Sequence, residues 1–187
     1  MNTIYTTQND LLLNNLMMFY KNEKYLERML KIITGESKIS LRIVDWFVTN
    51  FAKEYFTLYT IHSETGQPKR FKVYFDYKLK LKAYSKKRFD PFCRWDRISI
   101  PYKNGTFIET TIGQLNFFKW AIENHIIEYI EKHYETIEKD MNCRNSTSKR
   151  KETVVDNSKT RKKREELSIS ASKSMKKEEV EIVVQFH

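Results

Sequence analysis

Cations and aromatic rings are interleaved along one stretch of the sequence, residues 69–97. This stretch holds eleven Lys and Arg residues against three acids, a net charge of +8. Ammonium and guanidinium groups bind phosphate oxygens and flat rings stack on bases, so the mixture is typical of a nucleic-acid-binding surface. The cations that we expect to contact a polyanion are Lys72, Lys78, Lys80, Lys82, Lys86, Lys87, Arg88, Arg94 and Arg97.

The first half of this stretch has a strict period of two. From Phe71 to Tyr84, apolar residues take the odd positions, while the even positions carry four lysines and two tyrosines. Successive side chains of a strand point to opposite faces, so the alternation predicts a long half-buried strand with one basic face. That face would bind the polyanion. The alternative is that its lysines only keep an exposed strand soluble and prevent edge pairing.

A second group of cations lies in residues 142–187, which carry twelve Lys and Arg against seven acids and no aromatic residue before Phe186. Such a composition buries too little apolar area to fold, so it predicts a disordered basic tail after a globular domain of residues 1–141. Two clusters could contact nucleic acid, act in nuclear import, or simply be solvated. They comprise Lys149, Arg150, Lys151, Arg161, Lys162, Lys163 and Arg164.

The last residues of the chain form a short β-prone segment. Such a segment could bind a partner by adding a strand to a sheet edge, or it could be a terminal tuft without a partner. The side chains that would make the contact are Ile182, Val183, Val184 and Phe186.

The acids and histidines do not form a catalytic or metal-binding pattern. The available acids, Asp76, Asp90, Asp96 and Glu109, lack the acid and lysine spacing of a metal-dependent nuclease, and the sequence has no glycine-rich phosphate loop. His125 and His133 are eight residues apart, too far for a one-turn pair of metal ligands. Cys93 has no neighbouring histidine, so we expect a buried structural thiol. We therefore expect no enzyme activity, no metal and no other cofactor.

Periodicity and capping residues predict the remaining helices and strands. Spacings of three and four predict helices between residues 9 and 33, and a further helix after Ser40. One hairpin joins residues 56–62 to the long strand, and another turns at Asn104-Gly105. Thr111 and Gln114 fit a capping box that opens a helix of about seven turns. The predicted fold is α+β: amino-terminal helices, an antiparallel sheet of about four strands, one long helix packed on the sheet, and the disordered basic tail.

The length, net charge and cysteine count limit the classes of protein that fit the sequence. The chain has 187 residues, a formal net charge of +10 and two cysteines, which excludes a disulfide-rich secreted domain. It has no apolar run of about 18 residues and no signal-peptide pattern at its start. We expect a soluble protein of a reducing compartment that does not bind membranes.

Three runs carry a resemblance to a known family: SLRIVDWFVTN at residues 40–50, LKAYSKKRFDPFCR at 81–94, and ETTIGQLNFF at 109–118. They resemble small proteins of the nucleocytoplasmic large DNA viruses, nearest to mimivirus-like members. The resemblance implies a non-enzymatic scaffold of the virus factory in the host cytoplasm, where a folded module and a charged tail build a condensate around viral DNA.

The partners implied are viral DNA and either further copies of the chain or other viral proteins. The alternative is a discrete nucleic-acid-binding protein or a DNA-associated protein of the virion.

Overall fold

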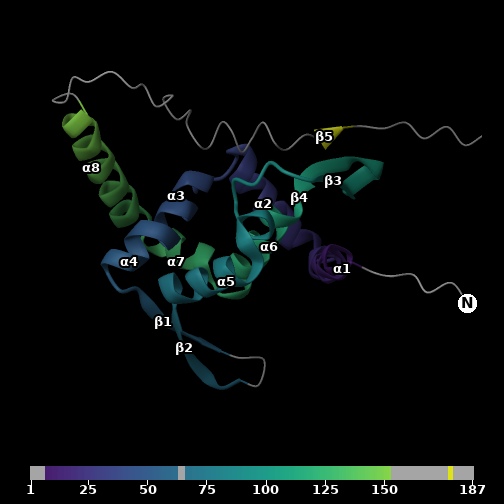
Figure 1. Cartoon of the computed structure of the whole chain (residues 1–187), viewed down its shortest axis with the longest axis horizontal. Coiled ribbons are helices and arrows are strands. Elements are labelled where there is room, and N and C mark those ends of the chain that lie inside the picture. Colours follow the sequence, from purple (N-terminus) through teal and green to yellow (C-terminus); the bar gives the residue numbers. More distant parts are fainter. Residues whose placement is uncertain (1–6, 63–65, 153–176, 179–187) are drawn as a thin grey trace, which may run out of the picture.

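The computed structural model describes residues 7–62, 66–152 and 177–178 (Figure 1). Its helices are α1 (Gln8–Tyr20), α2 (Glu23–Thr34), α3 (Leu41–Trp46), the π-helical turn η1 (Phe47–Phe51), α4 (Ala52–Glu54), α5 (Val73–Arg88), the 3₁₀ turn η2 (Lys103–Gly105), α6 (Ile112–Glu123), α7 (Ile126–Lys132) and α8 (Tyr134–Glu152). Its strands are β1 (Leu58–His62), β2 (Pro68–Lys72), β3 (Arg97–Pro101), β4 (Phe107–Thr111) and β5 (Lys177–Glu178).

The described strands form two separate antiparallel sheets. Strand β1 pairs with β2, placing Leu58 opposite Lys72, and β4 lies between β3 and β5. The two hairpins lie on different sides of a helical centre (Figure 1). The predicted α+β class is confirmed, and so are both hairpins. The expectation of one sheet of about four strands is wrong.

The predicted long strand is also wrong, because the chain becomes helical at Val73. The alternating segment also has helical spacing, and the side chains with that spacing face the core: Val73, Tyr77, Leu81 and Tyr84. Phe75 and Leu79, which the strand would have buried, are 58% and 66% exposed. A helix buries the first set against α6, so the tertiary partner decides between two periodicities that the sequence carries together.

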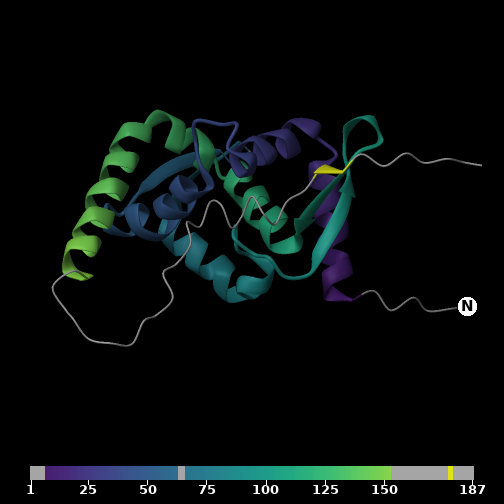
Figure 2. The same cartoon turned by 90° about the horizontal axis from the view of Figure 1, so that it is seen from above.

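Helix α6 is the centre of the fold, and nine of its twelve residues are buried. It contacts α1, α2, α5 and α7 (Figure 2). Its Phe117 and Trp120 rings join Tyr77 and Phe89 in an aromatic cluster with ring centroids 5.5–6.3 Å apart. The cluster fixes the inward face of α5.

The expected single helix after Thr111 is broken into three. Thr111 caps α6 as predicted, accepting a hydrogen bond from the Gln114 N–H at 3.2 Å. The helix then ends at Glu123, and His125 adopts a left-handed conformation with φ 55°. Helices α7 and α8 follow with changed directions (Figure 1), so among the described residues the expected single long helix packed on a sheet is not found.

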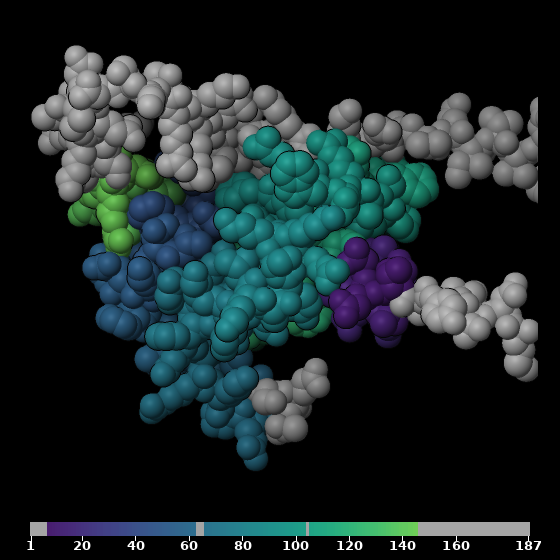
Figure 3. Space-filling model, in the orientation of Figure 1, coloured from purple at the N-terminus to yellow at the C-terminus, as the bar shows by residue number. Residues whose placement is uncertain are grey.

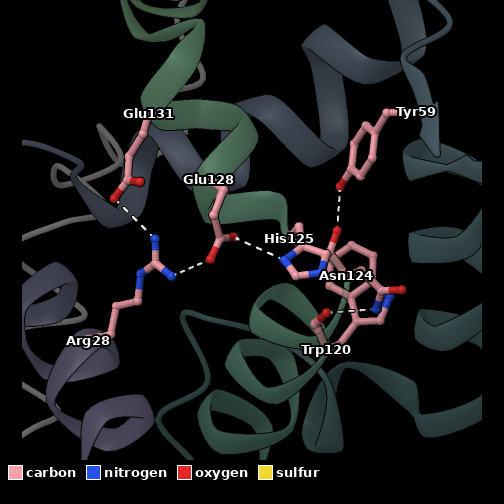
Figure 4. Close-up of polar contacts among 7 residues, drawn as sticks. All are labelled: Arg28, Tyr59, Trp120, Asn124, His125, Glu128 and Glu131. Atoms are coloured by element: carbon pink, nitrogen blue, oxygen red, sulfur yellow. Dashed lines mark hydrogen bonds and ion pairs between the residues drawn. The ribbon is translucent and has the colours of Figure 1, made fainter. Parts of the chain in front are cut away.

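Hydrogen bonds from distant elements hold this break (Figure 4). The Tyr59 hydroxyl donates to the backbone carbonyl of Asn124 at 2.6 Å. The side-chain amide of Asn124 donates to the backbone carbonyl of Trp120 at 2.8 Å. Arg28 on α2 forms ion pairs with Glu128 and Glu131 on α7. Of the two carbonyls, only that of Asn124 depends on a distant donor, because the Trp120 carbonyl also accepts from the Asn124 backbone N–H at 3.2 Å.

Helix α8 continues through Asn142 to Glu152, so the expected domain boundary falls inside a helix. Strand β5 then returns to the fold, with Glu178 opposite Phe107 and Lys177 opposite Ile108. The prediction of disorder for 153–176 and 179–187 concerns residues outside those described.

The hydrogen bond between α1 and α6 provides a test of this packing. The buried Tyr20 hydroxyl donates to the Leu115 carbonyl at 2.8 Å, and burial raises the pKa of Tyr20 well above its usual value, which keeps the donor protonated. Tyr20→Phe should lower the free energy of unfolding by about 1–2 kcal/mol, measured by urea titration, because the buried hydrogen bond between the two helices is lost. The control is Tyr25→Phe, which keeps the ring stacked on Phe19. Equal stabilities of the two variants would contradict the prediction.

Candidate nucleic-acid interface

The outward side of α5 and its N-cap carries a row of exposed residues that we call the α5 stripe. Its members are Lys72, Phe75, Lys78, Leu79 and Lys82; each lies three or four residues from another member, so they share one side of the helix. Helix α5 lies in front in Figure 1, and its teal atoms spread across the middle of the face in Figure 3. The predicted mixture of lysine and aromatic residues is therefore present, on a helix rather than on a strand.

The cations of the stripe lie near rings and away from carboxylates. Lys72 Nζ lies 5.9 Å from the centroid of the Phe75 ring, and Lys78 Nζ lies 5.9 Å from that of Tyr74. Within the described ranges, seven of the predicted cations form no ion pair: Lys72, Lys78, Lys80, Lys82, Lys86, Arg88 and Arg94. The charges of Lys72, Lys78 and Lys82 are therefore not neutralised at short range, so they can act on a phosphate.

Two other predicted cations form ion pairs within the fold. Lys87 Nζ lies 2.7 Å from a carboxylate oxygen of Asp96, and Arg97 Nη1 lies 3.1 Å from one of Glu109. Lys80 is half-buried and does not share the stripe, so the expectation that the even-numbered lysines form one face is wrong. The +8 stretch is therefore divided over several surfaces.

A kink separates the stripe from the cations at the end of α5. Ser85 has φ 63° and ψ 166°, which interrupts the helix before Lys86, Lys87 and Arg88. The Arg88 carbonyl then accepts a hydrogen bond from the Asn116 side chain at 2.9 Å, and the Cys93 thiol donates to the Lys87 carbonyl at 3.4 Å. These bonds fix the segment after the kink against α6.

Cys93 is buried, as the sequence predicted. A Cβ added at Gly113 would lie 2.8 Å from the Cys93 Cβ, so the loop packs closely on the start of α6. Beyond it Trp95 is 71% exposed, next to the exposed Arg94.

The structure places only some of the tail candidates. Helix α8 includes Lys149, Arg150 and Lys151. The other candidates fall outside the described residues: Arg161, Lys162, Lys163, Arg164, Ile182, Val183, Val184 and Phe186.

No metal site or membrane span was found in the described part of the chain. There, no group of three or more His, Cys, Asp or Glu is placed to hold a metal ion. No helix among the described residues is both long enough and apolar enough to cross a membrane.

Comparison with known proteins establishes the family. The model of a family of unknown function, DUF7197, matches residues 2–185. The chain belongs to this family. A relative from Acanthamoeba polyphaga mimivirus, uncharacterized protein L507, is 48% identical over 143 residues, which are 74% of this chain and 54% of the relative. The chain thus spans about half the length of this curated relative. No solved structure matches the chain.

The mimivirus relative supports the predicted giant-virus origin of the DUF7197 protein.

One acidic pair beside the end of α5 was missed by sequence analysis. Burial and, to a smaller extent, the nearby Asp90 raise the pKa of Asp45 on α3 to about 6, and Lys86 opposes the shift. Burial also raises the pKa of Asp90, although its carboxylate accepts a hydrogen bond from the Phe92 N–H at 2.8 Å. Periodicity gives no sign of this pair, because it arises only where α3 meets the loop after α5.

The raised pKa of Asp45 makes the stability of the DUF7197 protein dependent on pH. The fold disfavours the ionised carboxylate, so stability is lost as the pH rises from 3.8 to about 6. Asp45→Asn should therefore stabilise the protein by about 2 kcal/mol at pH 8 and by much less at pH 4. Urea titrations at both pH values measure this difference. The companion Asp90→Asn should recover part of the same gain, and a similar loss of stability at both pH values in Asp45→Asn would refute the prediction.

Proposed function

We propose that the DUF7197 protein is a non-enzymatic protein that binds nucleic acid through phosphate contacts. One observation carries the proposal: the exposed Lys72, Lys78 and Lys82 share one side of a helix anchored in the core and form no ion pair with any described residue. Each phosphate that they contact releases condensed counterions, which gives affinity without reading base sequence. Binding should therefore be salt-dependent and sequence-tolerant.

The finer proposal is that the protein is a scaffold of the cytoplasmic virus factory. It carries a folded basic surface and a basic tail, so one copy can contact DNA at two places, and multivalent contact raises effective local concentration. The giant-virus relative favours viral DNA as the polyanion, with further copies or other viral proteins as partners.

The alternative is a discrete DNA-binding protein, acting in the factory or in the virion. The pairing of β5 with β4 favours it, because the tail then returns to its own fold instead of reaching a neighbour.

The α5 lysines provide the first test. In Lys78→Gln/Lys82→Gln, binding to a labelled duplex should weaken and the slope of log affinity against log salt should fall by about 2, since two phosphate contacts are lost. Fluorescence anisotropy over a salt series measures this. The control Lys24→Gln/Lys139→Gln removes the same charge from exposed positions on α2 and α8. Equal effects of the two double variants would mean that net charge, not the α5 stripe, determines binding.

The scaffold role is tested by condensation of the full chain with DNA. Wild-type protein should form salt-sensitive droplets near physiological ionic strength, where screening acts over about 8 Å and leaves close contacts effective. Alanine at Arg161, Lys162, Lys163 and Arg164 should raise the threshold concentration several-fold, because these residues are the densest charge in the tail.

A fragment of residues 1–152, which keeps α8 whole, should not form droplets. Light scattering across a salt series measures droplet formation by the wild type, the alanine variant and the fragment. A one-to-one complex with DNA and no droplets at high wild-type concentration would favour the alternative.

A further inference from the structure

The α5 stripe exposes apolar groups that phosphate binding does not require. Phe75 is 58% exposed and Leu79 66%. Leu58, opposite Lys72 in the β1–β2 ladder, is 53% exposed and extends the apolar surface beyond the helix. An exposed ring among unpaired cations therefore needs an explanation that charge alone does not give.

The surroundings of Phe75 suit a flat, anionic ligand. Lys72 precedes it by three residues and Lys78 follows it by three, so cations flank the ring along the stripe. The half-buried Tyr74 meets the Phe75 ring nearly edge-on, with centroids 6.0 Å apart and an interplanar angle of 74°. Tyr74 thus supports the ring while Lys72 and Lys78 can reach groups on both sides of it.

We propose that the α5 stripe binds single-stranded in preference to double-stranded nucleic acid, with Phe75 stacking on a base while Lys72 and Lys78 contact the flanking phosphates. The proposal rests on the proposed function and names the ligand class of the same site. In a duplex the faces of the bases are hidden within the stack, whereas a single strand exposes them. A phenyl ring reads no base edge, so the stacking is sequence-tolerant.

A second copy of the chain suits this surface poorly. In a symmetric dimer the same patch meets itself, so the three lysines of one stripe would face the three of the other. Like charges brought together at an interface oppose association, and no described carboxylate lies in ion-pair contact with these lysines to compensate. A polyanion neutralises the same charges on binding.

The test compares three polyanions on the full-length protein: a labelled oligothymidylate of about 20 nucleotides, a duplex of the same length, and heparin. Wild type should bind the single strand more tightly than the duplex. Phe75→Leu, which keeps apolar bulk but loses the π-face, should weaken single-strand binding by about 5- to 150-fold, the contribution of one stacked base. Its affinity for the duplex and for heparin should be unchanged.

Two matched variants separate stacking from other effects. Phe75→Tyr retains an aromatic ring and should restore single-strand binding. Leu79→Ala removes apolar surface from the next turn of the stripe without removing a ring, and should leave the preference for the single strand intact. Equal affinities of wild type for single strand and duplex, or equal weakening of both by Phe75→Leu, would overturn the inference.

The failure of the inference can be told from the failure of the proposed function. If single-strand preference is absent but Lys78→Gln/Lys82→Gln still lowers the salt slope, phosphate binding stands and the stacking role is wrong. Wild type that binds none of the three polyanions at low salt would overturn both. A fall in molar mass by light scattering in Phe75→Leu and Leu79→Ala would assign the stripe to contact between copies, which also overturns the inference.

Discussion

The packing of α5 on α6 is the interaction on which the rest of the structure depends. Aromatic pairs add about 0.5–1.5 kcal/mol each beyond the area they bury, and Tyr77 takes part in three such pairs. The buried Trp120 indole would lack a partner in an apolar core, and Asp76 on α5 accepts its N–H at 2.6 Å. With the inward face of α5 fixed in this way, its outward face is determined, and that face is the α5 stripe.

How much the sequence could predict depended on whether a signal was local. The position of the turn at Asn104-Gly105, the Thr111 cap and the burial of Cys93 follow from short-range chemistry and were predicted correctly. The long strand failed because Leu, Lys and Ala after Tyr77 are strong helix formers, a propensity that the alternation concealed. Weighing that propensity against the period of two could have revealed the helix.

Other features could not be predicted because they depend on contacts distant in the sequence. The break at His125 is held by Tyr59 and Arg28, from elements 66 and 97 residues away in the chain. The exposure of Phe75 likewise follows from the choice of helix over strand. For the candidate site, sequence analysis identified the lysines, but it assigned the ring between them to the wrong side of the element.

The contrast between the α5 stripe and the tail is one of entropy as well as charge. Folding has already fixed the backbone that carries Lys72, Lys78 and Lys82, so binding must order only their side chains. The composition of the tail predicts a disordered backbone that must become ordered when its cations bind. This entropic cost lowers the affinity that each charge contributes, but a disordered backbone lets the cations reach further. Under the proposed function, the stripe would orient the protein on a nucleic-acid strand, and the tail would contact further strands around it. The two basic regions would then have different roles in binding.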